Sequence, residues 1–142
     1  MKIYGIACDK SGYPAIVQYI ASDPQDICFT SIVKVPCLGI IKESEMLEAL
    51  ETDCDLLLLA GCPLDSCYNL QGSRFAQRRV IKVNRLLEEA ETTKRVCLSL
   101  VTSEKIAELK RVLDLARTIL DKQTTSRIEK AKRTKPGEES ET

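Results

Sequence analysis

Short apolar runs alternate with amphipathic stretches along most of this chain. Between the runs, apolar residues recur at spacings of three and four, the period of a helix with one buried face. Runs with the length and composition of β-strands cover residues 2–7, 27–35, 55–60 and 95–101. The alternation predicts a parallel α/β sheet.

The runs differ in polarity, which predicts their places in the sheet. Residues 55–60 are apolar after the first, as in a central parallel strand, whereas Thr30 and Lys34 interrupt the run 27–35 and indicate an edge strand. The amphipathic stretches predict helices over residues 14–20 and 44–51, from an N-cap at Ser73 to Ala90, and from an N-cap at Ser103 to Leu120. The third of these helices is expected to bury one continuous stripe, made of Ala76, Val80, Val83, Leu87 and Ala90.

The element order predicts a flavodoxin-like sheet, with four strands in the order 2-1-3-4, right-handed crossovers and flanking helices. In such sheets, functional groups gather outside the carboxyl ends of the strands, near strands one and three. The helical period fades near Lys122. We therefore expect one α/β domain over residues 1–121 and a flexible polar tail over residues 122–142.

Composition narrows the classes of function. Lys plus Arg and Asp plus Glu both number 21, so net charge gives no indication of a nucleic-acid or membrane partner. No apolar run is long enough to span a bilayer and no export pattern opens the chain, so we expect a cytoplasmic protein with reduced thiols. The chain has no histidine, which excludes mixed Cys/His zinc sites and the usual nucleophile–base pairs.

Four of the seven cysteines follow predicted strands and therefore share one edge of the sheet. Cys8 follows the first strand, Cys37 the second and Cys62 the third, and Cys67 lies in the same loop as Cys62. The second, first and third strands are neighbours, and adjacent strands lie about 4.8 Å apart, so the edge that carries the four thiols spans roughly 10 Å. Loops can close that distance around a small centre. Four thiolates meeting there predict a metal centre. The remaining cysteines are expected to be ordinary buried residues: Cys28, Cys54 and Cys97.

All-thiolate ligation is typical of iron–sulfur clusters and of structural zinc. Zinc sites of this kind usually have two Cys-x2-Cys pairs, which this chain lacks, so the spacing favours a [2Fe–2S] centre. A scaffold domain with a four-cysteine zinc site is the alternative. Six further residues are expected around the centre. They are the loop glycines Gly61 and Gly72, the positively charged Arg74, Arg78 and Arg79, and Ser11 with its hydroxyl.

A cysteine-dependent phosphatase or arsenate reductase needs a Cys-x5-Arg loop. The sixth residue after Cys8 is Pro14, after Cys62 it is Tyr68, and after Cys67 it is Ser73. A flavin site would need a Ser/Thr-rich loop after the first strand, which is also missing. No independent catalytic residues are therefore expected.

The chain contains Ala60-Gly61-Cys62-x4-Cys67, followed at fixed spacing by Gly72, Ala76, Arg78 and Arg79. This segment and two others resemble the iron–sulfur delta subunit of methyl-viologen-reducing hydrogenase, a family that also occurs beside heterodisulfide-reductase-A-like flavoproteins. The family signature reads AGC-HPGD-C, then HYxxGN and AxRR; here the first part is AGC-PLDS-C, and the spacing holds from Ala60 to Arg79. Tyr68 and Asn69 replace the His-Tyr pair, and Ser73 replaces the asparagine. The other two segments are Val35-Pro36-Cys37-Leu38-Gly39 and Ala7-Cys8-Asp9-Lys10-Ser11.

The chain departs from the family at Ser11, where many members have a further cysteine. Four cysteines remain, enough for a [2Fe–2S] cluster, and Ser11 is expected to serve at the start of a helix. The resemblance implies an electron-transfer subunit of an anaerobic oxidoreductase complex. Its expected partners are a heterodisulfide-reductase-A-like flavoprotein and a second redox subunit of the hydrogenase, methylenetetrahydrofolate reductase or acyl-CoA reductase type.

Overall fold

A parallel sheet forms the centre of the molecule. The computed structural model describes residues 1–22, 24–25, 27–63, 71–102 and 106–133, with residues 124–133 as backbone alone. Within these residues the strand order is β2-β1-β3-β4, so the predicted four-stranded sheet in the order 2-1-3-4 is confirmed. The strands are β1 (Lys2–Cys8), β2 (Cys28–Val35), β3 (Leu56–Gly61) and β4 (Arg95–Leu100).

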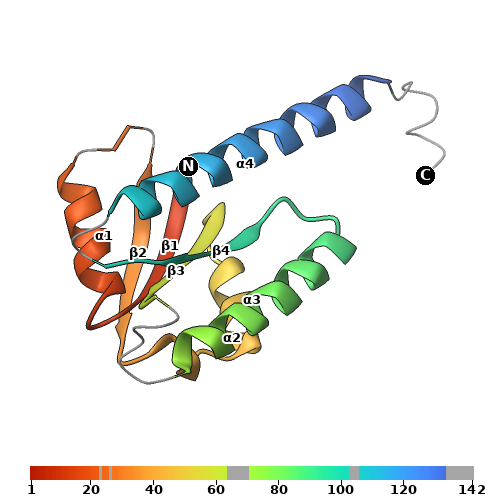
Figure 1. Ribbon diagram of the computed structural model, residues 1–142. Coiled ribbons are helices and arrows are strands. Elements are labelled where there is room, and N and C mark those ends of the chain that lie inside the picture. The colour runs from red at the N-terminus through yellow and green to blue at the C-terminus, as the bar shows by residue number, and fades with distance from the viewer. Residues whose placement is uncertain (23, 26, 64–70, 103–105, 134–142) are drawn as a thin grey trace.

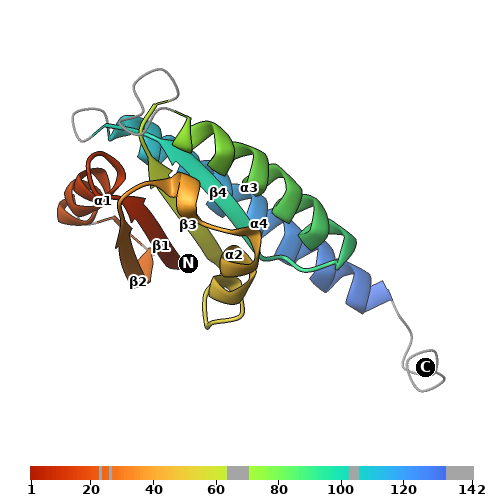
Figure 2. The same ribbon diagram turned by 90° about the horizontal axis from the view of Figure 1, so that it is seen from below.

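Helices cover both faces of the sheet, as Figures 1 and 2 show from two sides. Helices α1 (Gly12–Ala21) and α4 (Ala107–Arg133) lie on one face. Helices α2 (Glu43–Leu50) and α3 (Gly72–Glu89), with the short 3-10 helix η1 (Leu38–Ile40), lie on the other. Each face therefore has its own apolar core, as expected for a doubly wound sheet.

Strand β3 lies between the two cores, and all of its residues are buried. Its alternating side chains enter the two cores in turn: Leu57 and Leu59 pack under α2 and α3, and Leu56 and Leu58 under α1 and α4. The prediction of a central strand from its uninterrupted apolar run is confirmed. Strand β2 has mostly exposed or half-buried residues and lies at the edge, also as predicted.

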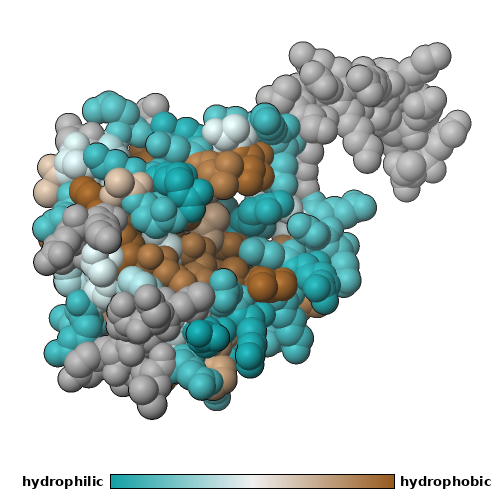
Figure 3. All heavy atoms as spheres, viewed as in Figure 1, coloured by the Kyte–Doolittle hydropathy of each residue, from teal (hydrophilic) through white to brown (hydrophobic). Residues whose placement is uncertain are grey.

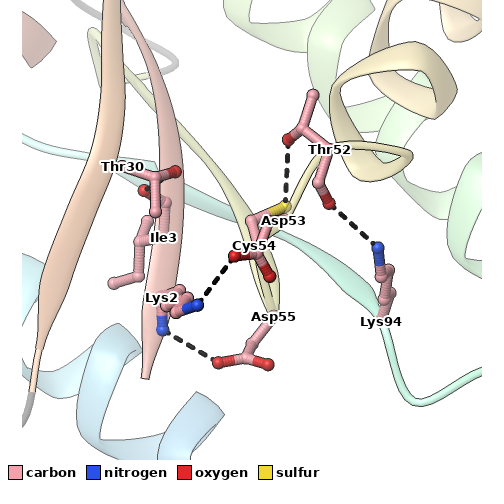
Figure 4. A network of polar contacts seen from close by, with 8 residues as sticks. All are labelled: Lys2, Ile3, Thr30, Thr52, Asp53, Cys54, Asp55 and Lys94. Carbon is pink, nitrogen blue, oxygen red and sulfur yellow. Dashed lines mark hydrogen bonds and ion pairs between the residues drawn. The ribbon is translucent and has the colours of Figure 1, made fainter.

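A polar network closes the amino-terminal edge of the sheet (Figure 4). The Lys2 ammonium lies 2.7 Å from the Asp53 carboxylate, and the Lys2 backbone N–H donates to Asp55. Cys54 is buried within this network, next to the Thr52 hydroxyl. The expectation that Cys54 is an ordinary buried residue is therefore confirmed.

The outer edge of β4 is partly covered by a side chain. Asn84 on α3 donates to the Val96 carbonyl and accepts from the Val96 N–H, at 2.8 and 2.9 Å. The amide takes the place that a neighbouring strand would have. Hydrophobic side chains gather on this side of the molecule, between α3 and α4 (Figure 3).

Four local predictions were wrong. Helix α3 begins at Gly72 with Gln71 as its N-cap, so Ser73 lies inside the helix, where its buried hydroxyl makes a tertiary contact. Ala90 and Cys28 are exposed rather than buried. Helix α4 continues to Arg133, although its apolar period ends near Leu120, so residues 122–133 are helical. Whether residues 122–142 behave as a separate tail stays a prediction, and the predicted cap Ser103 lies outside the described residues.

Candidate metal centre

Two of the predicted ligands meet at the carboxyl ends of the central strands. Cys8 is the last residue of β1, and Cys62 directly follows β3. The two strands are parallel neighbours in register, with Ala7 opposite Ala60. The Cys8 and Cys62 sulfur atoms lie 3.7 Å apart, and the residues are 3% and 6% exposed.

The distance between these sulfur atoms is informative. A disulfide has a bond of about 2.05 Å, which is far shorter. Two thiolates at tetrahedral positions about 2.3 Å from one metal ion are about 3.8 Å apart, by simple trigonometry. The observed 3.7 Å matches this separation, and it is also an ordinary contact distance between two thiols.

Helix α1 begins against the first of these sulfurs. The Gly12 N–H donates to the Cys8 sulfur at 3.2 Å. The backbone N–H groups at the start of α1 and the positive end of its dipole therefore lie against this sulfur. The helix approaches closely because residue 12 is glycine: a Cβ there would lie 1.9 Å from the Ala60 carbonyl oxygen. This role of Gly12 was not predicted, although a glycine four residues after a strand-end cysteine is a signal for it.

Cys37 lies in the neighbouring loop, after β2. It is the N-cap of η1, its sulfur accepts the Gly39 N–H at 3.3 Å, and it is half-buried. The loop from β1 is tied to the end of β2, because the Asp9 N–H donates to the Val35 carbonyl at 2.8 Å. The loops carrying Cys8 and Cys37 therefore share one side of the sheet edge.

Arg79 holds the loop that carries Cys37. One nitrogen of its guanidinium donates to the carbonyls of Gly39 and Ile41, the latter at 2.9 Å. Gly39 also packs on the start of α3, where a Cβ would come within 2.9 Å of the Gly72 Cα. This fixes η1 against α3. The predicted residues Arg79 and Gly72 therefore act on the site by positioning the loop.

The other predicted neighbours of the centre have different surroundings. The Ser11 hydroxyl donates to the Val101 carbonyl, at the carboxyl end of β4, and makes no side-chain cap to its own helix. Gly61 packs against Leu38, whose Cδ1 atom would be 2.4 Å from an added Cβ. Arg74 and Arg78 are exposed on α3. Ser73, whose hydroxyl donates to the Cys62 carbonyl at 2.7 Å, anchors the third cysteine segment instead.

The structure brings part of the predicted ligand set together. Cys8 and Cys62 are in contact, and Cys37 occupies the adjoining loop; Cys67 lies outside the described residues. Across the described ranges, no three potential ligand side chains form one group. The donor chemistry at this edge nevertheless fits an iron–sulfur or zinc centre, since two buried sulfurs lie at ligand separation and two sulfurs already accept backbone N–H groups.

Cys97 on β4 differs from these residues. It packs against the core under α1 and α4, and burial raises the pKa of its thiol to about 11, although Arg95 opposes the shift. A thiol with so high a pKa is a poor metal ligand near neutral pH. The expectation that Cys97 is a core residue is consistent with this environment.

The fold and this edge together define a small doubly wound α/β protein with a cysteine site at the switch point of its sheet. The chain belongs to the family described as methyl-viologen-reducing hydrogenase, delta subunit, which matches residues 3–122. A curated relative, an iron-sulfur subunit of the F420-non-reducing hydrogenase of Archaeoglobus profundus, is 34% identical over 58 residues. That match covers 41% of this chain and 42% of the relative, so it spans less than half of either protein.

Among the helices that the structure describes, none combines the length and the hydrophobicity needed to cross a bilayer. The cytoplasmic location expected from the sequence stays a prediction.

Proposed function

We propose that this protein is an electron-transfer subunit that holds one [2Fe–2S] cluster at the carboxyl edge of its sheet. Cys8, Cys37, Cys62 and Cys67 would hold the cluster, which supplies a one-electron carrier when bound. The 3.7 Å contact between the sulfurs of Cys8 and Cys62 carries the proposal. Family membership supports it, as does the iron–sulfur name of the curated relative.

The surrounding residues have defined tasks in this proposal. Gly12 and Gly39 donate N–H groups to sulfur, which stabilises added negative charge and raises the reduction potential of a thiolate-bound centre. Burial of Cys8 and Cys62 keeps water from one side of the site. Arg79 keeps the Cys37 loop in place.

We further propose that the subunit passes electrons between a heterodisulfide-reductase-A-like flavoprotein and a second redox enzyme of an anaerobic complex. The second enzyme would be a hydrogenase, a methylenetetrahydrofolate reductase or an acyl-CoA reductase. The absence of any histidine makes acid–base catalysis by this chain itself unfavourable. Its contribution to the reaction would be electron transfer alone.

Anaerobic reconstitution tests the proposal. The protein purified without oxygen should bind about two irons and two sulfides and show the charge-transfer absorption of a [2Fe–2S] centre. Replacing Cys8, Cys37, Cys62 or Cys67 with alanine, one at a time, should lower the bound iron and abolish or alter the spectrum. Cys28→Ala and Cys54→Ala are the matched controls and should retain the full iron content.

Circular dichroism would verify that each variant is folded. One zinc ion per chain, without iron or sulfide after reconstitution, would contradict the proposal and favour the zinc scaffold instead. Loss of iron in the Cys28 or Cys54 variants, with retention in the other four, would place the centre at a different edge.

A further inference from the structure

An exposed surface beside Cys37 combines apolar and basic side chains. It consists of Ile40 on η1 and of Arg74, Phe75 and Arg78 on the first turns of α3, and is here called the rim face. Ile40 is 56% exposed and Phe75 43%, and both arginines are exposed. The contact between Gly39 and Gly72 places η1 directly against the start of α3 (Figure 2).

The arginines of the rim face have no acidic partner among the described residues. Arg74 and Arg78 are four residues apart and therefore project from the same side of α3. In contrast, the neighbouring Arg79 binds backbone carbonyls, and Lys82 lies 3.6 Å from the Glu43 carboxylate. Two exposed arginines without a described acidic partner make the rim face a local positive region, which attracts an acidic surface.

The rim face also lies next to the more accessible part of the proposed centre. Cys37 is half-buried and caps the helix that carries Ile40, whereas Cys8 and Cys62 are buried. Among the three described cysteines of the proposed centre, Cys37 is the most exposed, so its loop offers a path from the centre to a docked molecule. The sequence analysis assigned Arg74 and Arg78 to the cluster, but their exposure suits contact with another molecule.

We propose that an acidic redox protein docks on the rim face and exchanges electrons with this chain past Cys37. The inference rests on the proposed function and adds the place and chemistry of the contact. One electron leaves the reduced iron–sulfur centre, and the oxidised redox group of the partner gains it. A small contact with an apolar centre and charged surroundings is typical of transient redox complexes.

A pair of haem proteins of opposite charge tests this inference. The reduced, reconstituted protein is mixed with oxidised cytochrome b5, which is acidic, or oxidised cytochrome c, which is basic, and haem reduction is followed by stopped flow. At low ionic strength, Arg74→Glu/Arg78→Glu should slow the reaction with cytochrome b5 about tenfold or more, and added salt should remove the difference. The reaction with cytochrome c should not slow.

The matched control is Lys110→Glu/Lys122→Glu, which makes the same charge change at exposed positions of α4 and should behave as the unmodified protein. Phe75→Ala should weaken binding of cytochrome b5 without changing the salt dependence. The absorption of the cluster is recorded before the kinetics, so that failure of the proposed function and failure of the docking proposal can be distinguished. A protein that binds no cluster contradicts the proposed function. A protein that binds the cluster can be used to test docking.

Equal slowing of the cytochrome b5 reaction in the α3 and α4 variants would overturn the inference, since net charge alone would then explain the rates. Tight binding of a single-stranded oligonucleotide to the rim face at physiological salt, with no effect of its arginines on cytochrome b5, would overturn it in favour of a nucleic acid. Exposed apolar side chains beside only two arginines favour a protein partner.

Discussion

At the scale of single residues, the glycines and cysteines in and around the sheet differ sharply in their surroundings. Gly12 permits helix α1 to approach β3, and its N–H reaches the Cys8 sulfur. Gly5, in the middle of β1, has no comparable constraint, because a Cβ there would meet its nearest atoms at 3.5 Å. The cysteines differ as well: Cys97 is enclosed and its thiol has a raised pKa, whereas Cys28 is exposed.

Gly12→Ala should destabilise the fold by about 3 kcal/mol, because backbone rather than a flexible side chain occupies the space of the new methyl group. Urea unfolding of the apoprotein measures this change. Gly5→Ala, the matched control, should change the free energy of unfolding by less than about 1 kcal/mol. Equal effects of the two substitutions would show that α1 is not held close to β3.

Cys97 should make the protein less stable at alkaline pH. Its thiol has an ordinary pKa of 9.0 and a folded pKa of about 11, so the unfolded chain releases the proton first as the pH rises. The resulting stability is complete below pH 9 and is lost between pH 9 and 11, by about 3 kcal/mol.

Urea unfolding at a series of alkaline pH values measures the loss. Cys97→Ser should flatten this part of the pH profile, whatever its effect at neutral pH, whereas Cys28→Ser should leave the profile unchanged. A profile that Cys97→Ser does not alter would place the titrating group elsewhere.

At the scale of elements, α3 connects more parts of the molecule than its amphipathic pattern indicates. Its apolar stripe of Ala76, Val80 and Val83 is buried, as predicted. Its polar side chains also make tertiary contacts: Ser73 with the Cys62 segment, Arg79 with the Cys37 loop, and Asn84 with the edge of β4. The helix therefore sets the positions of two cysteine-bearing segments at once.

Arg79→Ala should shorten the lifetime of the cluster several-fold, because the Cys37 loop loses two charge-assisted hydrogen bonds, each contributing roughly 1.5–3 kcal/mol. Bleaching of the cluster absorption under a chelator measures the lifetime. Arg85→Ala, an exposed arginine on the same helix, is the control and should bleach at the rate of the unmodified protein. Identical rates in both variants would contradict the positioning role of Arg79.

At the scale of the whole molecule, the sheet and its two cores account for nearly all of the buried residues. Helix α4 contributes Leu109, Leu113 and Ala116 to the core under it. Beyond Leu120 it continues as a helix to Arg133 although the sequence has little apolar pattern there, so the sequence did not indicate where the helix ends. Periodicity reports burial of a helix face, whereas helix length also depends on local propensity.

A chain ending after Asp121 should fold cooperatively and assemble the cluster as the full chain does, with a loss of stability of at most about 1 kcal/mol. Thermal unfolding followed by circular dichroism, together with the cluster absorption, measures both. A chain ending after Leu113 is the contrasting variant: it removes Ala116 and should unfold or aggregate, because part of the core is left open. Failure of the longer chain to fold would show that residues 122–142 belong to the domain.

From the amino-acid sequence one can predict the order of strands and helices, the central place of β3 and the common edge of the strand-end cysteines. This is possible because burial repeats along a strand or helix with a fixed period and because parallel strands align their carboxyl ends. Which groups meet depends on the folded chain. Cys8 and Cys62 are separated by 54 positions in the chain, and their contact depends on strand register.

The same limit explains the individual misses. Ser73 has the residue type of an N-cap but faces the Cys62 carbonyl, and Gly12 serves through the space it leaves next to Ala60. Cys28 is apolar in type yet exposed, since it begins an edge strand. Local pattern specifies which side of an element is buried, whereas the identity of the group opposite it is a property of the assembled fold.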